Sequence, residues 1–135
     1  MPCAAFIVED HAAIREGLSE ALQELAGIST SGWAGSVQEA LAWLAAPLRA
    51  WDIAIVDLLL PDGSGLQVLR ALQGRAPARK VVVLTATATA PVRARCLALG
   101  ADAVFDKAME TEPLLDWCAA VAAASASVGP GAAPA

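Results

Sequence analysis

The chain has 135 residues, of which 57% are hydrophobic and 17% charged, and its net charge is −5. This length fits one domain that can bury a core without disulfides or a structural metal. The hydrophobic content excludes an intrinsically disordered chain. The acidic balance offers no basic stripe to neutralise phosphates, which argues against direct nucleic-acid binding.

The sequence also argues against membrane insertion and secretion. Its most apolar tract, 114–126, is largely alanine and contains Asp116, whereas a spanning helix needs about 20 strongly apolar residues. The N-terminus lacks the basic region of a signal peptide. Cys3, Cys96 and Cys118 share no metal-binding spacing and are expected to be free thiols. These features predict a cytoplasmic protein with no membrane contact.

In chain order, five short apolar runs alternate with five segments of helical periodicity. The predicted strands are 4–9, 28–34, 52–58, 80–86 and 103–106. The first, third and fourth are continuous Ile/Val/Leu-rich runs, typical of strands buried on both faces of a parallel sheet. The predicted helices are 11–26, 36–46, 66–73, 91–99 and 111–124.

Local signals mark the helix ends. The first helix places one apolar stripe at Ile14, Leu18, Ala21, Leu22 and Leu25. Residues 36–39 form a predicted capping box, and Thr111 is the predicted N-cap of the last helix. Gly27, Gly74 and Gly100 stand where helices should end in a left-handed conformation.

Strand–helix alternation over the whole length predicts an α/β sandwich. Five βα units fit a flavodoxin-like (βα)5 fold with a parallel sheet in the order 2-1-3-4-5, since a βα barrel needs about 250 residues. We expect a domain over residues 1–124. Residues 125–135 have the Ser/Gly/Pro/Ala composition of a flexible tail.

Polar residues follow four of the predicted strands. Glu9 and Asp10 follow the first, Asp57 closes the third, Thr85 lies at the end of the fourth and Lys107 follows the fifth. Ligands bind beyond the carboxyl ends of the strands in open parallel sheets, so these side chains are expected to converge.

The charges of this group predict a cation. Three carboxylates and one ammonium leave two negative charges, and two like charges about 4 Å apart repel by roughly 4 kcal/mol at an effective dielectric of ~20. A divalent cation cancels that excess. Oxygen donors without cysteine or histidine favour Mg²⁺, with Mn²⁺ as substitute, over Zn²⁺.

A carboxylate beside Mg²⁺ and lysine suits phosphoryl transfer, with Asp57 as the central acceptor of an aspartyl-phosphate. Taken singly, each residue has a structural explanation. Asp10 can cap the next helix, Thr85 can be structural, and Lys107 can be a solvated surface charge. Their occurrence at four strand ends favours a site.

These residues carry a resemblance to response-regulator receiver domains of two-component signalling, of the chemotaxis-regulator type. The matching pieces are Glu9-Asp10-His11, the D-x-x-x-P-x-G-x-G stretch over 57–65, Thr85-Ala86, and Gly100-Ala101-Asp102 followed by Lys107. The resemblance spans residues 4 to 124. Each motif is weak alone, but the combination is specific.

The resemblance implies roles for these positions. Asp57 would be phosphorylated by a histidine kinase or phosphotransfer protein. Mg²⁺ would be held by Asp10, Asp57 and the Leu59 backbone carbonyl, with Glu9 acting through water. Phosphate binding and switching would involve Thr85, Ala86 and Lys107. Such a domain is not a turnover enzyme, although it can phosphorylate itself from phosphodonors and dephosphorylate slowly.

Three positions depart from the family pattern. The family usually has an aromatic residue three positions before the lysine, where this chain has Val104. Its neighbour Phe105 should point to the opposite face, so it cannot take over that role without a register shift. Ala108 replaces a frequent proline, which predicts the absence of the usual cis peptide. Leu59 is apolar where many members are polar, and we expect it to shield the acyl-phosphate from water.

The resemblance also implies partners. The output would be a downstream protein effector or a covalently linked output domain, with no nucleic acid bound through this domain. A homodimer is possible through the fourth helix, fifth strand and last helix, where an apolar patch is predicted at Val92, Cys96, Leu115, Trp117 and Val121.

Three alternatives remain open at this stage. A pseudo-receiver would act without phosphorylation, which Val104 mildly favours. An aspartate-nucleophile phosphatase of the haloacid dehalogenase type would need a second Asp at position 59, which is leucine here. A flavin-binding protein would need a phosphate-binding loop after the first strand, where Glu9 and Asp10 would repel phosphate.

Overall fold

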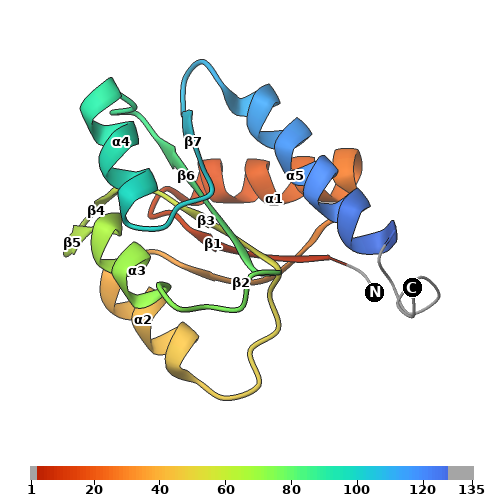
Figure 1. The fold of residues 1–135 in the computed structure, drawn as a ribbon, viewed down its shortest axis with the longest axis horizontal. Helices are drawn as coiled ribbons and strands as arrows, with labels where there is room; N and C mark the ends of the chain where they lie inside the picture. The colour runs from red at the N-terminus through yellow and green to blue at the C-terminus, as the bar shows by residue number, and fades with distance from the viewer. Residues whose placement is uncertain (1–2, 128–135) are drawn as a thin grey trace.

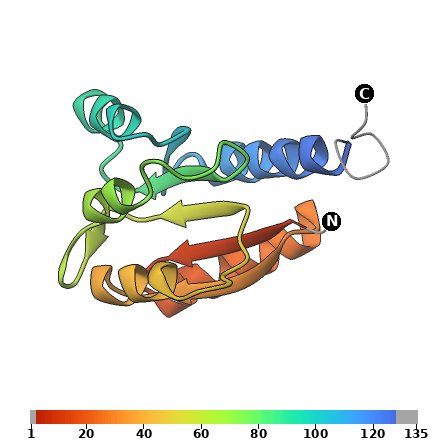
Figure 2. The same ribbon diagram turned by 60° about the horizontal axis from the view of Figure 1, so that its bottom comes forward.

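The computed structural model describes residues 3–127 and shows three layers (Figures 1 and 2). Its central five-stranded sheet has the order β2-β1-β3-β6-β7, and every neighbouring pair is parallel. The elements are β1 Ala4–Val8, α1 Ala12–Ala26, β2 Ser29–Ala34, α2 Val37–Ala45, β3 Ile53–Val56, β4 Leu59–Leu60, β5 Gly63–Ser64, α3 Gly65–Ala71, β6 Lys80–Thr85, α4 Ala90–Ala98, β7 Ala103–Asp106 and α5 Thr111–Ser127. The flavodoxin-like fold and the predicted 2-1-3-4-5 order are thereby confirmed.

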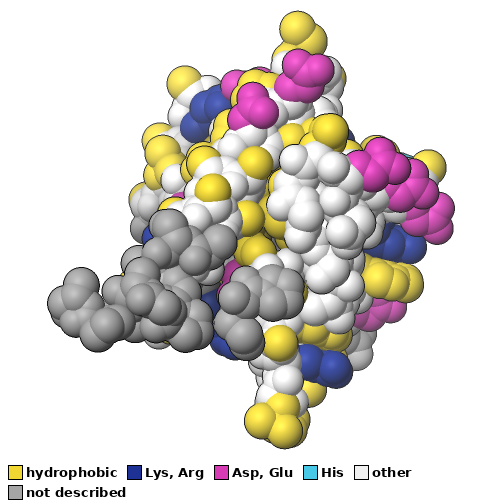
Figure 3. All heavy atoms as spheres, turned by 90° about the vertical axis from the view of Figure 1, so that its right-hand side faces the viewer, with side chains coloured by type: hydrophobic (Ala, Val, Ile, Leu, Met, Phe, Trp, Pro, Cys, Tyr) yellow, Lys and Arg dark blue, Asp and Glu magenta, His cyan; other side chains and the backbone are white. Residues whose placement is uncertain are grey.

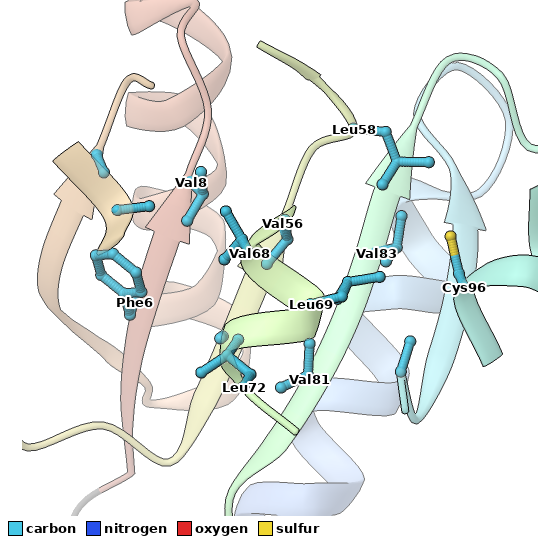
Figure 4. Close-up of a cluster of buried hydrophobic side chains, with 14 of the residues drawn as sticks. Phe6, Val8, Val56, Leu58, Val68, Leu69, Leu72, Val81, Val83 and Cys96 are labelled. Atoms are coloured by element: carbon cyan, nitrogen blue, oxygen red, sulfur yellow. The ribbon is translucent and has the colours of Figure 1, made fainter. Parts of the chain in front are cut away.

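Alternate residues of the central strands pack into two separate hydrophobic cores, one on each face of the sheet. In β1, Phe6 and Val8 face α2, α3 and α4, whereas Ala5 and Ile7 face α1 and α5. Figure 4 shows the first of these cores, where α3 lies over β1, β3 and β6. Because helices cover both faces, the inner strands β1 and β3 are apolar at every position, whereas the edge strand β2 is largely polar and partly exposed.

Several local expectations need correction. The stripe of α1 is narrower than predicted: Leu18 and Leu22 are buried, but Leu25 is 70% exposed. Thr111 is the first residue of α5 rather than its cap, and its hydroxyl donates to the Lys107 carbonyl. Helix α5 continues to Ser127, so residues 125–127 are helical and 128–135 of the predicted tail lie outside the described residues.

Other expectations agree with the structure. Gly27 ends α1 at φ 65°, and Gly74 and Gly100 also have positive φ. The peptide between Lys107 and Ala108 is trans, because residues 3–127 contain no cis peptide bond.

The predicted apolar patch on α4, β7 and α5 is smaller than expected. Cys96 is fully buried and Leu115 is 8% exposed, so neither belongs to the surface. Val92, Trp117 and Val121 are half-buried against the two cores. Figure 3 shows a different face, the one where α5 ends, on which most charged side chains lie towards the edges of the view. None of the helices within residues 3–127 is long and apolar enough to cross a membrane.

The N-terminus of α2 carries a modified form of the predicted capping box. Ser36 Oγ accepts from the Glu39 N–H at 3.1 Å, as expected. The Glu39 carboxylate accepts from the Gly35 N–H at 2.8 Å rather than from Ser36. The reciprocal bond is therefore displaced by one residue.

A second cap on α2 comes from the β4–β5 hairpin, which periodicity does not predict. Asp62 accepts from the Val37 N–H at 2.7 Å and from the Gln38 N–H at 2.9 Å. The hydrogen bonds from Gln38 and Val37 lower the pKa of Asp62. A carboxylate at a helix N-terminus satisfies exposed N–H groups and complements the helix dipole. This contact fixes the hairpin that follows Asp57 against α2.

Because its folded pKa is lowered, Asp62 contributes stability above the ordinary carboxyl pKa, and this is lost as the pH falls through the folded value. We expect Asp62→Asn to lower the Tm at neutral pH. The difference from the native chain should shrink below about pH 3.9. Calorimetry across this range tests it, with Asp116→Asn as control because Asp116 is exposed on α5. Equal Tm values for the two variants at neutral pH would contradict the assignment.

Candidate functional site

The carboxyl ends of the parallel strands bring distant residues to one edge of the sheet. Glu9 directly follows β1, Asp57 follows β3, Thr85 closes β6 and Lys107 follows β7. Backbone hydrogen bonds hold this edge: the Asp57 N–H donates to Val8 O at 3.0 Å, and the Lys107 N–H donates to Thr85 O at 2.9 Å. The strand register therefore positions these side chains before they contact one another.

A single ammonium joins two buried carboxylates at this edge. Lys107 Nζ lies 2.6 Å from Glu9 Oε1 and 2.8 Å from Asp57 Oδ2. Glu9 and Asp57 are 3% and 4% exposed, so water screens their charges only weakly. The predicted convergence of Glu9, Asp57 and Lys107 is present in the structure.

These contacts keep the lysine charged. Burial disfavours the ammonium, but hydrogen bonds to Asp57 and Glu9 and the attraction of both carboxylates outweigh it, so the pKa of Lys107 is raised. The ion pairs thus stabilise the fold fully below the ordinary lysine pKa of about 10.4, and this contribution is lost as the pH rises through the folded value.

Asp10 and His11 continue the acidic edge towards solvent. The Asp10 side chain is 31% exposed, and its Oδ1 lies 3.3 Å from His11 Nδ1. The same His11 nitrogen lies 3.5 Å from Glu9 Oε2, and the His11 N–H donates to that oxygen at 3.2 Å. One potential ligand atom from each of these three residues lies within 4.8 Å of the others.

The donor set fits a hard divalent cation. Lys107 compensates one of the two buried carboxylates, and Asp10 adds a further negative charge beside Glu9. Carboxylate oxygens of this kind suit Mg²⁺. The backbone of Leu59 also lies close to Asp57, since its N–H is 3.4 Å from Asp57 Oδ1. His11 was not among the predicted ligands, and its ring nitrogen now lies beside two of them.

Thr85 and Ala86 lie at the start of the β6–α4 loop. Thr85 is fully buried, and its Oγ1 lies 3.2 Å from Thr87 Oγ1 and accepts from the Thr87 N–H at 3.3 Å. Ala86 is exposed. The hydroxyl predicted to bind phosphate is therefore engaged within its own loop.

Val104 and Phe105 point to opposite faces of β7, as strand alternation predicts. Val104 is 8% exposed and belongs to the core under α4. Phe105 packs on the other core, with its ring edge-on to Trp117 at 6.5 Å between centroids. Phe105 therefore does not substitute for an aromatic side chain at position 104.

The second glycine of the 57–65 motif has a steric reason. A Cβ added to Gly65 would lie 2.1 Å from the Asp57 carbonyl oxygen, which is closer than any real contact. The Gly65 N–H donates to Leu58 O at 2.9 Å. Glycine thus lets the start of α3 pack directly against the backbone of Asp57.

Arg15 also contacts the site, although sequence reasoning did not select it. Its Nη1 donates to the Glu9 carbonyl at 3.0 Å, and its guanidinium lies 3.6 Å from the ring centroid of Trp33. Trp33 is 54% exposed, so the pair covers the outer side of the β1 end. No local pattern relates Arg15 to Trp33, because the contact depends on how α1 packs beside β2.

Comparison with known proteins identifies the family. A model described as the response regulator receiver domain matches residues 5–119. The chain therefore belongs to the response regulator receiver domain family, whose members are signalling modules that generally bind Mg²⁺.

Named relatives agree with this assignment. The DNA-binding transcriptional activator DevR/DosR of Mycobacterium tuberculosis is 39% identical over 80 residues, covering 59% of this chain and 36% of the relative. Response regulator GacA of Pseudomonas aeruginosa is 28% identical over 124 residues, covering 92% of this chain and 57% of the relative. The chain spans about half the length of the curated relatives it matches.

Solved structures show the same fold. The BeF3-activated DrrB receiver domain has a TM-score of 0.74 at 24% identity, with 90% of this chain and 97% of that chain covered. A LuxR-family two-component response regulator from Aurantimonas has a TM-score of 0.78 at 21% identity, with 98% and 94% covered.

Removing the ammonium should expose the repulsion between the carboxylates. We expect Lys107→Met to lower the free energy of unfolding at neutral pH by about 1–3 kcal/mol, below the ~3–5 kcal/mol of a fully buried broken pair because the site borders solvent. Millimolar Mg²⁺ should recover part of the loss by replacing the missing positive charge. Urea denaturation with and without Mg²⁺ measures both effects.

Lys80→Met is the matched control, because Lys80 lies at the opposite end of β6 and forms no ion pair in the described part of the chain. The explanation fails if the two variants lose the same stability, or if Mg²⁺ stabilises both equally.

Proposed function

We propose that this chain is a phosphoacceptor that takes a phosphoryl group from a histidine kinase or phosphotransfer protein onto Asp57. The observation that carries the proposal is the Lys107 ammonium held between Asp57 and Glu9 at the edge of the sheet. Glu9 and Asp57 are buried, yet Asp57 lies beside the open end of the strands, where a donor can approach.

The proposed transfer forms one bond and breaks one. A carboxylate oxygen of Asp57 attacks phosphorus, the new O–P bond forms, and the N–P bond to the donor imidazole breaks. The imidazole leaves with the bonding electron pair and takes up a proton from water. Asp57 Oδ1 is the freer oxygen, since Oδ2 is bound by Lys107 at 2.8 Å and the Leu59 N–H is 3.4 Å from Oδ1.

Asp10, Asp57 and the Leu59 carbonyl would hold Mg²⁺, with Glu9 acting through water. When bound, the cation neutralises negative charge on the transferring group. Lys107 would then exchange a carboxylate oxygen for a phosphoryl oxygen, and Thr85 would leave Thr87 to donate to another. Ala86 is the next residue after Thr85, so its backbone would move together with the Thr85 side chain when the phosphoryl group is bound.

The receiver would extend to the end of α5 at Ser127, three residues beyond the predicted boundary at 124. The domain would act in the cytoplasm on a linked output domain or on a partner protein. Self-association would use α4, β7 and α5, where Leu97 is 50% exposed. Phosphorylation would shift a population between two conformers rather than drive turnover. Dephosphorylation would be slow.

Incubation with acetyl phosphate tests the acceptor directly. We expect intact mass spectrometry to show one phosphoryl increment that requires both Mg²⁺ and Asp57, so that Asp57→Ala and added EDTA each abolish it. Asp116→Ala is the matched control and should be labelled like the native chain, because Asp116 lies on α5 away from the strand ends. Labelling of Asp57→Ala, or labelling without a divalent cation, would refute the assignment.

Leu59 is expected to prolong the life of the aspartyl-phosphate. Its side chain is 59% exposed beside Asp57 and can exclude water from the acyl-phosphate, whereas an amide would bind water there. We expect Leu59→Asn to shorten the lifetime about threefold to tenfold, a barrier change of roughly 0.7–1.4 kcal/mol. Decay of the phosphorylated mass gives the lifetime. Leu97→Asn on α4 is the control, and an unchanged lifetime in Leu59→Asn would exclude shielding.

A further inference from the structure

Arg93, in the first turns of α4, binds three acceptors from separate segments. Its Nε donates to the Ala88 carbonyl at 2.9 Å, one terminal nitrogen donates to the Val104 carbonyl at 2.9 Å, and the other donates to Glu110 Oε1 at 2.5 Å. The guanidinium is planar and has a fixed fork geometry, so these bonds define the relative positions of their acceptors.

Glu110 is itself anchored to the strand end. The oxygen that Arg93 binds also accepts from the Asp106 N–H at 2.9 Å. The hydrogen bond from Arg93 and the one from Asp106 lower the pKa of Glu110, so it is charged at neutral pH. The contact is therefore a charge-assisted one between α4 and the segment that follows β7.

The acceptors of Arg93 lie in or beside the two loops that carry the phosphate-binding groups. Ala88 belongs to the β6–α4 loop, which starts after Thr85. Glu110 ends the β7–α5 loop, which starts at Lys107. Arg93 thus links the Thr85 loop to the Lys107 loop through side-chain contacts outside the carboxylate site.

This chain lacks the aromatic side chain that usually stands three residues before the lysine in the family, beside these two loops. Val104 is compact and buried, and a valine side chain has one torsion, so it cannot swing as an aromatic ring can. Thr85 is bound to Thr87 in the present arrangement. In the phosphorylated arrangement that the proposed function requires, Thr85 would leave Thr87, and a movement of the loop with it would stretch the bond from Arg93 to Ala88.

We propose that Arg93 is the positioning residue that sets the balance between the unphosphorylated and phosphorylated arrangements of the β6–α4 loop, by tying Ala88 to Val104 and Glu110. The contact favours the unphosphorylated arrangement. It replaces the aromatic side chain as the link between the acceptor site and the α4–β7–α5 face. This inference rests on the proposed function of Asp57.

Loss of this link should shift the population towards the phosphorylated arrangement. We expect Arg93→Ala to be labelled at Asp57 by acetyl phosphate and Mg²⁺ about threefold to tenfold faster than the native chain, because more molecules start in the competent arrangement. Hydrogen exchange over residues 86–92 and 104–110 of the unlabelled variant should approach that of the native chain bound to beryllofluoride and Mg²⁺. Loss of a merely structural contact would lower the Tm without moving the exchange pattern towards that of the beryllofluoride complex.

Further variants separate the contributions. Arg93→Lys keeps a charge for Glu110 but lacks the fork, so it should restore only part of the native exchange pattern. Glu110→Gln keeps an acceptor for the Asp106 N–H but removes the charge, and should accelerate labelling less than Arg93→Ala. Arg95→Ala is the matched control, because Arg95 is exposed on the same helix and forms no ion pair within residues 3–127. It should behave like the native chain.

The possible results test the role of Arg93 separately from the phosphorylation of Asp57. Failure of the native chain to be labelled at Asp57 would overturn the proposed function. Native labelling with an unchanged rate and exchange pattern in folded Arg93→Ala would overturn only the role of Arg93. Should Arg93→Ala fail to fold by circular dichroism, Glu110→Gln decides, and a native or slower rate in that variant overturns the role.

Discussion

The site depends on one ammonium shared by two buried carboxylates. Without Lys107, Glu9 and Asp57 would face each other with little solvent between them, and such a pair of like charges is costly. With one ammonium, the pair still carries an excess negative charge, to which Asp10 adds. Lys107 makes the two buried carboxylates tolerable in the fold. The negative charge that remains favours binding of a cation, and the cation and the ammonium together can stabilise a phosphoryl group.

The backbone makes this charge cluster possible. Parallel pairing places the ends of β1, β3, β6 and β7 at one edge, and two apolar cores hold the strands from both sides. Gly65 lets α3 approach the Asp57 carbonyl, and Asp62 fixes the intervening hairpin to α2. The acceptor thus follows directly on a strand buried on both faces, while the Thr85 loop is held by polar contacts to Thr87 and Arg93 and by the packing of Ala88 on the first core. This contrast is what a site that both binds and switches requires.

The position of Val104 connects the site to the rest of the molecule. In this chain a small buried side chain occupies the place of the family's aromatic residue, and an arginine on α4 spans the same region with three hydrogen bonds. A polar link of this kind is directional and can be broken by a small loop shift, whereas a packed ring must rotate through its neighbours. The Arg93–Glu110 ion pair would therefore be weakened by salt, whereas the packing of an aromatic ring would not.

The alternation of strands and helices could be predicted from the sequence, because apolar runs and helical periodicity are local signals. The strand order followed from the fold type that this alternation indicates, and the residues at the strand ends followed from the alignment of parallel strands. Three contacts could be seen only in the folded chain: Lys107 binds Glu9 as well as Asp57, Asp62 caps α2, and Arg93 joins two loops. The tertiary structure also placed Cys96 and Leu115 in the cores. These contacts join residues far apart in the chain, and their geometry arises only when strand register and helix packing are set together.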